Sequence, residues 1–380
     1  MVNIFPGAER AQRTLFLSLF TAALFLIAAC GTEKTAATDT TSSLNAAPSG
    51  VVPSPQSTEP ISIAAVGDIM LGSSFPDASG LPPKDGADLL KEVAPILARA
   101  DLAFGNLEGP MLEGGASAKC GPRSTKCFAF RVPTRYGRYL KEAGLDVMSL
   151  ANNHSSDFGR EGVESSKRVL RELGLAHTAE EGDVARLNIK GRKIIVVGFA
   201  TNNVSYNLND IEKARRVVAD LARQADILIV SFHGGAEGTA AQRVPYGRER
   251  YLGEERGDLR TFTHAVIDSG ADLVLGHGPH VVRGMEVYKD RLIAYSLGNF
   301  ATYGKFNLTG ALGLTMVLEA ELKSDGAFLG GRIHPATQTK PGGPRLDSAG
   351  QIIPVVRQLS QADFGQAGVK VDADGRFTRQ

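Results

Sequence analysis

Polar side chains with metal-binding chemistry recur directly after short apolar runs along this chain. Each run is rich in Val, Ile, Leu or Ala, which is typical of a buried strand. The residues that follow these runs are Asp68, then Asn106 with Glu108, then Asn153 with His154, then His233 with Glu237, then His277 with His280. A buried polar group costs free energy unless it is paired. These positions therefore predict a site at which a ligand offsets that cost.

The residue types indicate which ligand to expect. Asp, Glu, Asn and His side chains together suit a borderline divalent ion such as zinc, manganese or iron. No cysteine joins them, so a soft thiolate site is not expected. The most specific fragment is GHGPH, residues 276–280, because it places two histidines close together on a loop of Gly and Pro. Taken together, the positions predict a metal centre.

Each fragment by itself also has a simpler interpretation. Gly67–Asp68 is typical of a turn, and residues 106–108 of a polar loop. Residues 152–154 fit an Asx-turn, and Asp157 is expected to cap the helix that follows. His233 precedes two glycines, which fits a tight turn as well as a ligand-binding loop. The metal prediction therefore depends on the recurrence of such positions and not on any single one.

Alternating strand and helix patterns from residue 61 onward predict an α/β domain. Strand patterns cover 61–71, 102–109, 145–154, 193–200, 226–237 and 271–280, followed by a β-rich stretch at 290–300 and an edge or hairpin strand at 311–322. Helix patterns cover 86–100, which contains Pro95, then 135–144 and 159–174. Structure beyond about residue 341 is left open. In open α/β sheets, ligands bind beyond the carboxyl ends of the strands, so the scattered polar residues are expected to meet there.

The first 29 residues are similar to a bacterial signal peptide. Two arginines precede an apolar run from Leu15 to Ala29, which is short for a membrane span. The run ends in IAAC, which resembles a lipoprotein lipobox, so Cys30 is expected to be acylated. An ordinary signal peptide or an uncleaved anchor is the alternative. Residues 30–60, rich in Ala, Ser, Thr and Pro, are expected to be a disordered tether. The chain is therefore expected outside the cytoplasm, lipid-anchored to a bacterial membrane.

Composition narrows the partners. The 380 residues carry a formal net charge of +1, which gives no support for nucleic-acid binding, because such proteins usually show a basic excess. Cys120 and Cys127 stand seven positions apart, a spacing that fits neither a CxxC redox motif nor a zinc knuckle. Outside the cytoplasm they are expected to form a structural disulfide.

Five blocks of the sequence resemble the bacterial capsule-synthesis family of CapA type, which is linked to poly-γ-glutamate synthesis. They are AVGDIMLG, GNLEGP, SLANNHSSDFGREG, FHGGAE and GHGPHVVRGMEVYKDRLIAYSLGNF. The resemblance covers roughly residues 61–335 and implies one domain over 61–340, with 341–380 as a C-terminal extension. That family in turn resembles calcineurin-like metallophosphatases. The implied fold is therefore α/β, a sandwich of two β-sheets flanked by helices.

The resemblance also implies a role for each predicted site residue. His154 is the expected catalytic residue. The expected metal ligands are Asp68, Glu108 as a bridging carboxylate, Asn153, His233, His277 and His280. Apart from the resemblance, Asn106 and Glu237 are expected to orient ligands, Glu237 by way of His233. A solvent-exposed side chain is the alternative for Glu237.

Two positions depart from these patterns. Met70 stands where the phosphatase pattern places a histidine, and a thioether is a poor ligand for a borderline ion. Gly278 stands where many members of the capsule family carry a histidine before the proline. The site is therefore expected to hold one or two ions of Mn, Zn or Fe, with one position weak or empty.

Two functional hypotheses follow. The first is a metal-dependent hydrolase of a phosphoester or of an amide in a γ-glutamyl polymer, with His154 as general acid or base. The second is a non-catalytic assembly or export factor that binds an anionic polymer such as poly-γ-glutamate, or the membrane complex that makes it. Under that hypothesis the residues that could face the polymer are Arg131, Arg135, Arg243, Arg248, Arg250 and Arg283. A carbohydrate- or peptide-binding module is a third option, disfavoured by 7% aromatic residues and no Trp.

Overall fold

The computed structural model describes residues 59–121 and 127–380. The predicted signal peptide, Cys30 and nearly all of the predicted tether lie outside the described residues. Ser54–Gln380 forms one compact unit, and the fold is that of its described part. None of the helices in this part is long and apolar enough to cross a membrane.

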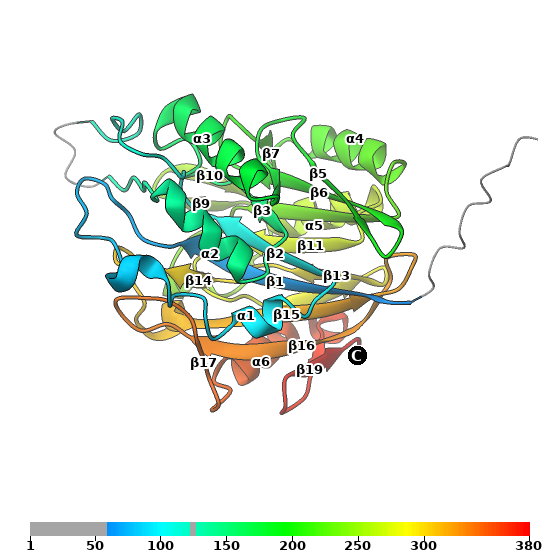
Figure 1. The fold of residues 1–380 in the computed structure, drawn as a ribbon. Coiled ribbons are helices and arrows are strands. Elements are labelled where there is room, and N and C mark those ends of the chain that lie inside the picture. Colours follow the sequence, from blue (N-terminus) through cyan, green and yellow to red (C-terminus); the bar gives the residue numbers. More distant parts are fainter. Residues whose placement is uncertain (1–58, 122–126) are drawn as a thin grey trace, which may run out of the picture. The chain divides into compact units, whose positions relative to one another are not determined.

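Two β-sheets make up the centre of the domain (Figure 1). The first has ten strands; its order is β18 (Lys370–Val371), β19 (Arg376–Thr378), β16 (Phe328–Thr337), β15 (Leu314–Leu322), β1 (Ile61–Met70), β2 (Leu102–Leu107), β3 (Val147–Ser149), β4 (Ala176–Thr178), with β14 (Asn299–Thr302) paired to β1 and β17 (Arg345–Leu346) to β16. The second has seven; its order is β12 (Met285–Tyr288), β13 (Arg291–Ala294), β11 (Leu273–His277), β8 (Ile227–His233), β6 (Arg192–Ala200), β5 (Ala185–Ile189), with β7 (Tyr206–Asn207) paired to β6. A separate hairpin joins β9 (Glu249–Tyr251) and β10 (Glu254–Gly257).

The side-chain alternation of the strands produces three buried layers. On β1, Ile61 and Ile63 face the second sheet, whereas Ala64 and Val66 face the helices on the other side. The first sheet is covered on that side by α1 (Ala94–Leu97), α2 (Gly137–Glu142) and α3 (Gly159–Glu172), and the second sheet by α4 (Ile211–Ala222) and α5 (Leu259–Asp268). The predicted α/β sandwich of two sheets flanked by helices is confirmed.

Several element boundaries differ from the predicted ones. The helix expected over 86–100 is wrong, since only residues 94–97 are α-helical and Pro95 lies in the first turn of that short helix. A proline is tolerated there because its missing N–H would be unpaired in any case. The 311–322 stretch contains β15 (Leu314–Leu322), a hairpin partner of β16 that lies inside the sheet and not at its edge.

The C-terminal residues, which the sequence left open, are part of the same unit. They supply β17, β18 and β19 to the first sheet, and α6 (Ile352–Phe364) packs Ile352 and Val356 into the core between the sheets.

Parallel pairing aligns the strand ends that carry the predicted site. Asp68 lies opposite Asn106 across β1 and β2, and His233 lies opposite His277 across β8 and β11. Gly67 is required beside Asp68, because a Cβ atom there would come 1.9 Å from the carbonyl oxygen of Gly298. That close approach lets the Asp68 N–H donate to the same oxygen at 2.9 Å, which fixes the end of β1.

Candidate metal centre

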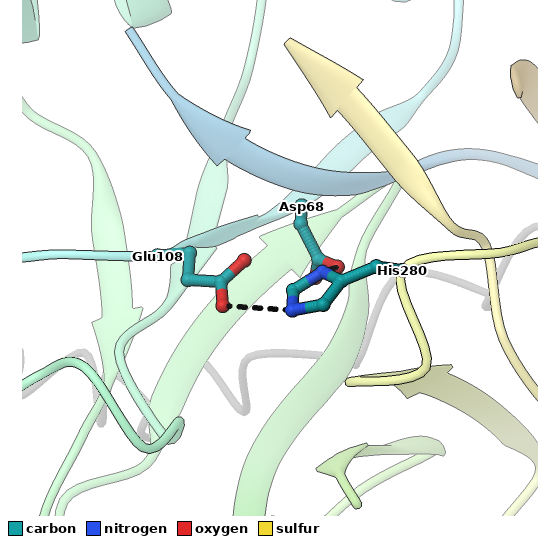
Figure 2. A group of neighbouring side chains, drawn as sticks. All are labelled: Asp68, Glu108 and His280. Atoms are coloured by element: carbon teal, nitrogen blue, oxygen red, sulfur yellow. Dashed lines mark hydrogen bonds and ion pairs between the residues drawn. The ribbon is translucent and has the colours of Figure 1, made fainter. Parts of the chain in front are cut away.

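Three buried side chains converge at the strand ends. Asp68, Glu108 and His280 each offer an atom within 4.8 Å of the other two, a grouping that could hold a metal ion (Figure 2). His280 Nδ1 lies 2.9 Å from Asp68 Oδ2, and its Nε2 lies 3.5 Å from Glu108 Oε1. The three residues come from β1, from the loop after β2 and from the loop after β11. Three of the five predicted strand exits, those of β1, β2 and β11, therefore meet at one place, and they come from both sheets.

Close backbone contact shapes the loop that carries His280. Gly278 has a φ of +113°, and a Cβ atom on it would come 2.6 Å from the carbonyl oxygen of Gly234. The Gly234 N–H donates to the His277 carbonyl oxygen at 2.9 Å, so the loops after β8 and β11 pack directly on each other. A histidine at position 278 would therefore not fit this arrangement. His280 itself has a φ of +59°, which is uncommon for a residue with a side chain.

The electrostatics of the group favour a bound cation. Glu108 is fully buried, and neither of its carboxylate oxygens has a hydrogen-bond partner. Burial raises the pKa of Glu108 to about 8, because the charged form loses its hydration. Burial alone would lower the pKa of His280, but the facing carboxylates of Glu108 and Asp68 outweigh it and raise that pKa to about 10. In the absence of a metal, the protonated His280 imidazole compensates the negative charge of the Asp68 and Glu108 carboxylates. A bound metal ion would compensate the same charge.

Atoms without partners extend the candidate site. Besides the two Glu108 oxygens, Asn153 Oδ1, His233 Nε2 and His277 Nδ1 are buried and have no hydrogen-bond partner. Buried polar atoms are nearly always paired in native proteins, so these five atoms, all on predicted metal ligands, call for a common explanation. Among the described residues, the close group consists of Asp68, Glu108 and His280, and the atoms on Asn153, His233 and His277 lie outside it. Carboxylate, amide and imidazole donors of this kind suit zinc, manganese or iron.

The two inner histidines are prepared for ligation. His277 Nε2 lies 3.2 Å from the carbonyl oxygen of Val66, which is how ligand histidines are commonly oriented through the ring nitrogen that does not bind metal. Burial, followed by the nearby Arg256 and the other histidines, holds the pKa of His233 well below its usual value. A neutral imidazole is the form that binds a metal.

Met70 makes no contribution of this kind. It is fully buried in the apolar cluster between the first sheet and its helices, with Leu71 and Phe130. The position at which phosphatases carry a histidine is therefore occupied by a core side chain.

Asn106 and Glu237 lie beside the ligands. Asn106 Nδ2 donates to Asp68 Oδ1 at 2.9 Å and lies 3.5 Å from His233 Nδ1. Glu237 was expected to orient His233, but its carboxylate pairs with Arg256 at 3.0 Å and lies 3.9 Å from His280 Nε2. Its influence is therefore exerted on His280.

His154 is held by a residue whose role the sequence misassigned. His154 Nδ1 lies 2.8 Å from Asp157 Oδ2, and its Nε2 lies 3.9 Å from Glu108 Oε1. Asp157 was expected to cap the following helix, but α3 begins at Gly159 with Phe158 as its N-cap and no side-chain cap bond. The buried carboxylate instead fixes the imidazole ring, since it accepts from Nδ1 and leaves Nε2 directed toward the ligands. Burial lowers the pKa of His154, while Asp157 opposes that shift.

Cys120 and Cys127 are joined by a disulfide in the structure, with their Cα atoms 5.6 Å apart. Lys119, next to Cys120, lies 3.3 Å from Asp157 Oδ1. Neither Asp157 nor Lys119 was a predicted site residue. The spacing of Asp157, three residues after His154 on a tight turn, was a signal that could have found it.

Comparison with known proteins agrees with this geometry. Residues 62–303 match the family model described as bacterial capsule synthesis protein PGA_cap. The chain belongs to this family. Among curated relatives, the capsule biosynthesis protein CapA of Bacillus anthracis is 27% identical over 64% of this chain, and the PGA biosynthesis protein CapA of Bacillus subtilis is 28% identical over 63%. The matches span 60% and 63% of those relatives' own length.

Solved structures with a similar fold include a nucleotidase and a phosphatase. A putative 5'-nucleotidase from Staphylococcus aureus has a TM-score of 0.42 and 15% identity, with 79% of this chain and 58% of that chain covered. A purple acid phosphatase from yellow lupin has a TM-score of 0.37 and 11% identity, with 77% and 54% covered. TM-scores this low say nothing about the chemistry of the site in this capsule-synthesis family member.

Proposed function

We propose that this chain is a metal-dependent hydrolase in the synthesis of a capsule or poly-γ-glutamate polymer, acting on a phosphoester or a γ-glutamyl amide. The observation that carries the proposal is the set of five buried atoms without partners on Glu108, Asn153, His233 and His277, beside a histidine oriented by Asp157. A binding surface has no need for such an oriented histidine next to its ligands. The role in polymer synthesis is supported by the names of the Bacillus relatives.

The residues that would hold the metal are Asp68, Glu108, Asn153, His233, His277 and His280. When bound, an ion at this site supplies a Lewis acid that polarises the scissile bond and makes water a stronger acid. His154 moves a proton at Nε2, the ring nitrogen that faces the ligands, while Asp157 keeps the other proton on Nδ1. The Phe130 ring packs against the His154 ring in a tilted arrangement, with centroids 4.4 Å apart, and limits the access of solvent to it.

The cellular setting belongs to the same proposal. The lipobox-like sequence at Cys30 and the polar segment 30–60 support a lipid-anchored protein outside the cytoplasm. An anionic polymer and the membrane complex that makes or exports it are the partners that fit this setting.

Metal content and turnover test the proposal together. The full chain, purified in detergent, is analysed for Mn, Zn and Fe and assayed on a phosphodiester and on γ-glutamyl oligomers. The expected result is one or two equivalents of metal and turnover, both lost in His280→Ala. His264→Ala is the matched control, because His264 also pairs with a carboxylate, Glu286, at 3.0 Å but contacts none of the predicted ligands within the described residues. Absence of metal from the wild-type protein would refute the proposal.

An assembly or export factor is the second candidate, and Met70 favours it because a core side chain replaces a metal-binding histidine. One equivalent of metal without turnover would support that role. The arginines offered for polymer binding are mostly engaged. Arg283 is fully buried and bound to Glu249 at 2.7 Å, so the expectation that it faces a polymer is wrong. Arg135 and Arg250 are exposed but pair with Asp85 and Glu255.

A further inference from the structure

Two segments of chain bind Asp157, one at its carbonyl oxygen and the other at its carboxylate, and the disulfide joins them. The first segment, residues 117–120, binds the Asp157 carbonyl oxygen through the N–H groups of Ala118 at 2.9 Å and Lys119 at 3.3 Å. The second, residues 127–130, binds the Asp157 carboxylate through the Phe130 N–H at 2.8 Å. The Cys120–Cys127 bond therefore closes a clamp around the residue that orients His154.

Additional contacts fix the first segment. Ser117 Oγ donates to the Asp157 carbonyl oxygen at 3.0 Å and accepts from the Cys120 N–H at 2.9 Å. Three donors from residues 117–119 thus converge on one carbonyl oxygen. Lys119 has its backbone held on this oxygen and its side chain directed back toward His154.

The Lys119 ammonium group lies at the edge of the candidate active site. Its Nζ atom is 3.3 Å from the Asn153 carbonyl oxygen, 3.4 Å from His154 Nδ1 and 3.3 Å from Asp157 Oδ1. An ammonium group has three N–H donors, and His154 Nδ1 offers no lone pair when its proton points at Asp157. At least one donor therefore remains for another acceptor. The Lys119 side chain is 37% exposed, so a ligand from solvent can reach it.

We propose that Lys119 binds an anionic oxygen of the substrate beside His154 and that the Cys120–Cys127 disulfide holds it in place. The ligand chemistry is an oxyanion, which a phosphate ester and a γ-glutamyl carboxylate both present. The inference rests on the proposed function of the site, because it concerns the same substrate. It adds a cation that the metal ligands do not include and gives the disulfide a role in binding.

Direct binding tests Lys119 independently of turnover. Calorimetry on the metal-loaded full chain measures the affinity for inorganic phosphate and for a γ-glutamyl dipeptide. Lys119→Met is expected to lower the affinity for the oxyanion that binds at this site by about 10- to 100-fold. That is the usual effect of losing one hydrogen bond to a charged group. Lys119→Arg is expected to restore most of the affinity. Lys289→Met is the control, because Lys289 lies on the turn between β12 and β13 and also pairs with a carboxylate, that of Asp268.

The pattern of losses identifies the source of the oxyanion. A loss for phosphate alone assigns a phosphoester substrate, and a loss for the dipeptide alone assigns a carboxylate. Unchanged affinity of Lys119→Met for both, or no binding of either to the wild-type protein, would overturn the inference. Binding that depends on Lys119 without any turnover would sink the proposed hydrolase while the inference stands.

A double-mutant comparison tests the clamp. Reducing the disulfide in the folded wild-type protein is expected to lower the affinity for the ligand about as much as Lys119→Met does. Reducing the disulfide in the Lys119→Met variant is expected to cause no further loss of affinity, because both changes remove the same interaction. The Cys120→Ser/Cys127→Ser variant gives the same comparison without reductant. Additive losses, or full affinity after reduction, would show that the disulfide does not act through Lys119.

Discussion

Replacing Asp157 by Asn tests the orientation of His154 with almost no change in shape. Asp157 is fully buried, and its Oδ2 serves both His154 Nδ1 and the Phe130 N–H at 2.8 Å. An Asn side chain has only one oxygen for these partners. If that oxygen takes the Oδ2 position, the amide N–H₂ faces the Lys119 ammonium group, which lies 3.3 Å from Oδ1; if it takes the Oδ1 position, the N–H₂ faces the Phe130 N–H and His154 Nδ1. In both orientations the charge-assisted bond from His154 to a carboxylate is lost.

The size of the effect follows from the bond that is lost. A hydrogen bond to a charged group contributes about 1.5–3 kcal/mol, and each 1.36 kcal/mol in the barrier is tenfold in rate. Loss of this bond alone therefore lowers kcat by about 10- to 100-fold. Complete loss of the function of His154 sets the upper limit, the roughly 10²- to 10⁴-fold that a general acid or base contributes. Metal content is expected to stay unchanged, because Asp157 is not a predicted ligand.

The assay compares kcat and bound metal for wild type, Asp157→Asn, His154→Gln and the double variant. The double variant is expected to be no slower than the slower single variant, since the two residues act as one unit. Asp183→Asn is the matched control, because Asp183 lies 3.3 Å from His177 Nδ1 and 3.2 Å from Lys167 Nζ but makes no contact with the predicted ligands in the described structure. An unchanged kcat, or parallel loss of metal and activity, would refute the reasoning.

Three further predictions concern the site and its support. Without metal, Glu108→Gln should stabilise the protein by about 1–3 kcal/mol at pH 9, since it removes a buried carboxylate that accepts no hydrogen bond, while His280 keeps its closer partner Asp68 at 2.9 Å. Added Mn or Zn should raise the Tm of the wild type and not that of Glu108→Gln. If the variant is less stable than the wild type without metal, the expected stabilisation is wrong. Gly67→Ala should cost about 3 kcal/mol or more in urea unfolding, because its Cβ would overlap the Gly298 carbonyl; a loss below 1 kcal/mol, about the size of an ordinary surface change, would show that β14 moves aside. Burial raises the pKa of Asp272 to about 6, above its unfolded value near 3.9. Its stabilising contribution is therefore present at low pH and lost as the pH rises through 6. The free energy of unfolding of the wild type, relative to that of Asp272→Asn, should fall by about 2 kcal/mol from pH 4 to pH 7. A difference that stays constant with pH would refute the raised pKa.

Local patterns in the sequence were enough to find most strands and the polar positions at their ends. The strand expected over 61–71 is β1, and the one expected over 226–237 contains β8. Patterns failed where neighbours decided the outcome. Residues 86–100 have helical spacing, yet only one turn around Pro95 is α-helical. The weakly periodic C-terminus forms strands and α6 because the first sheet offers partners and the core has room for Ile352 and Val356.

The site divides in the same way. Residue types and their place after strands determined that Asp68, Glu108 and His280 belong to one centre, because parallel strands end at a common edge. Only the tertiary structure showed that Asp157 holds His154, that Glu237 lies near His280, and that Lys119 reaches both Asp157 and His154. These assignments depend on where loops cross and which side chains they bury. Such contacts join residues distant in the chain, so the local period of a sequence carries no record of them.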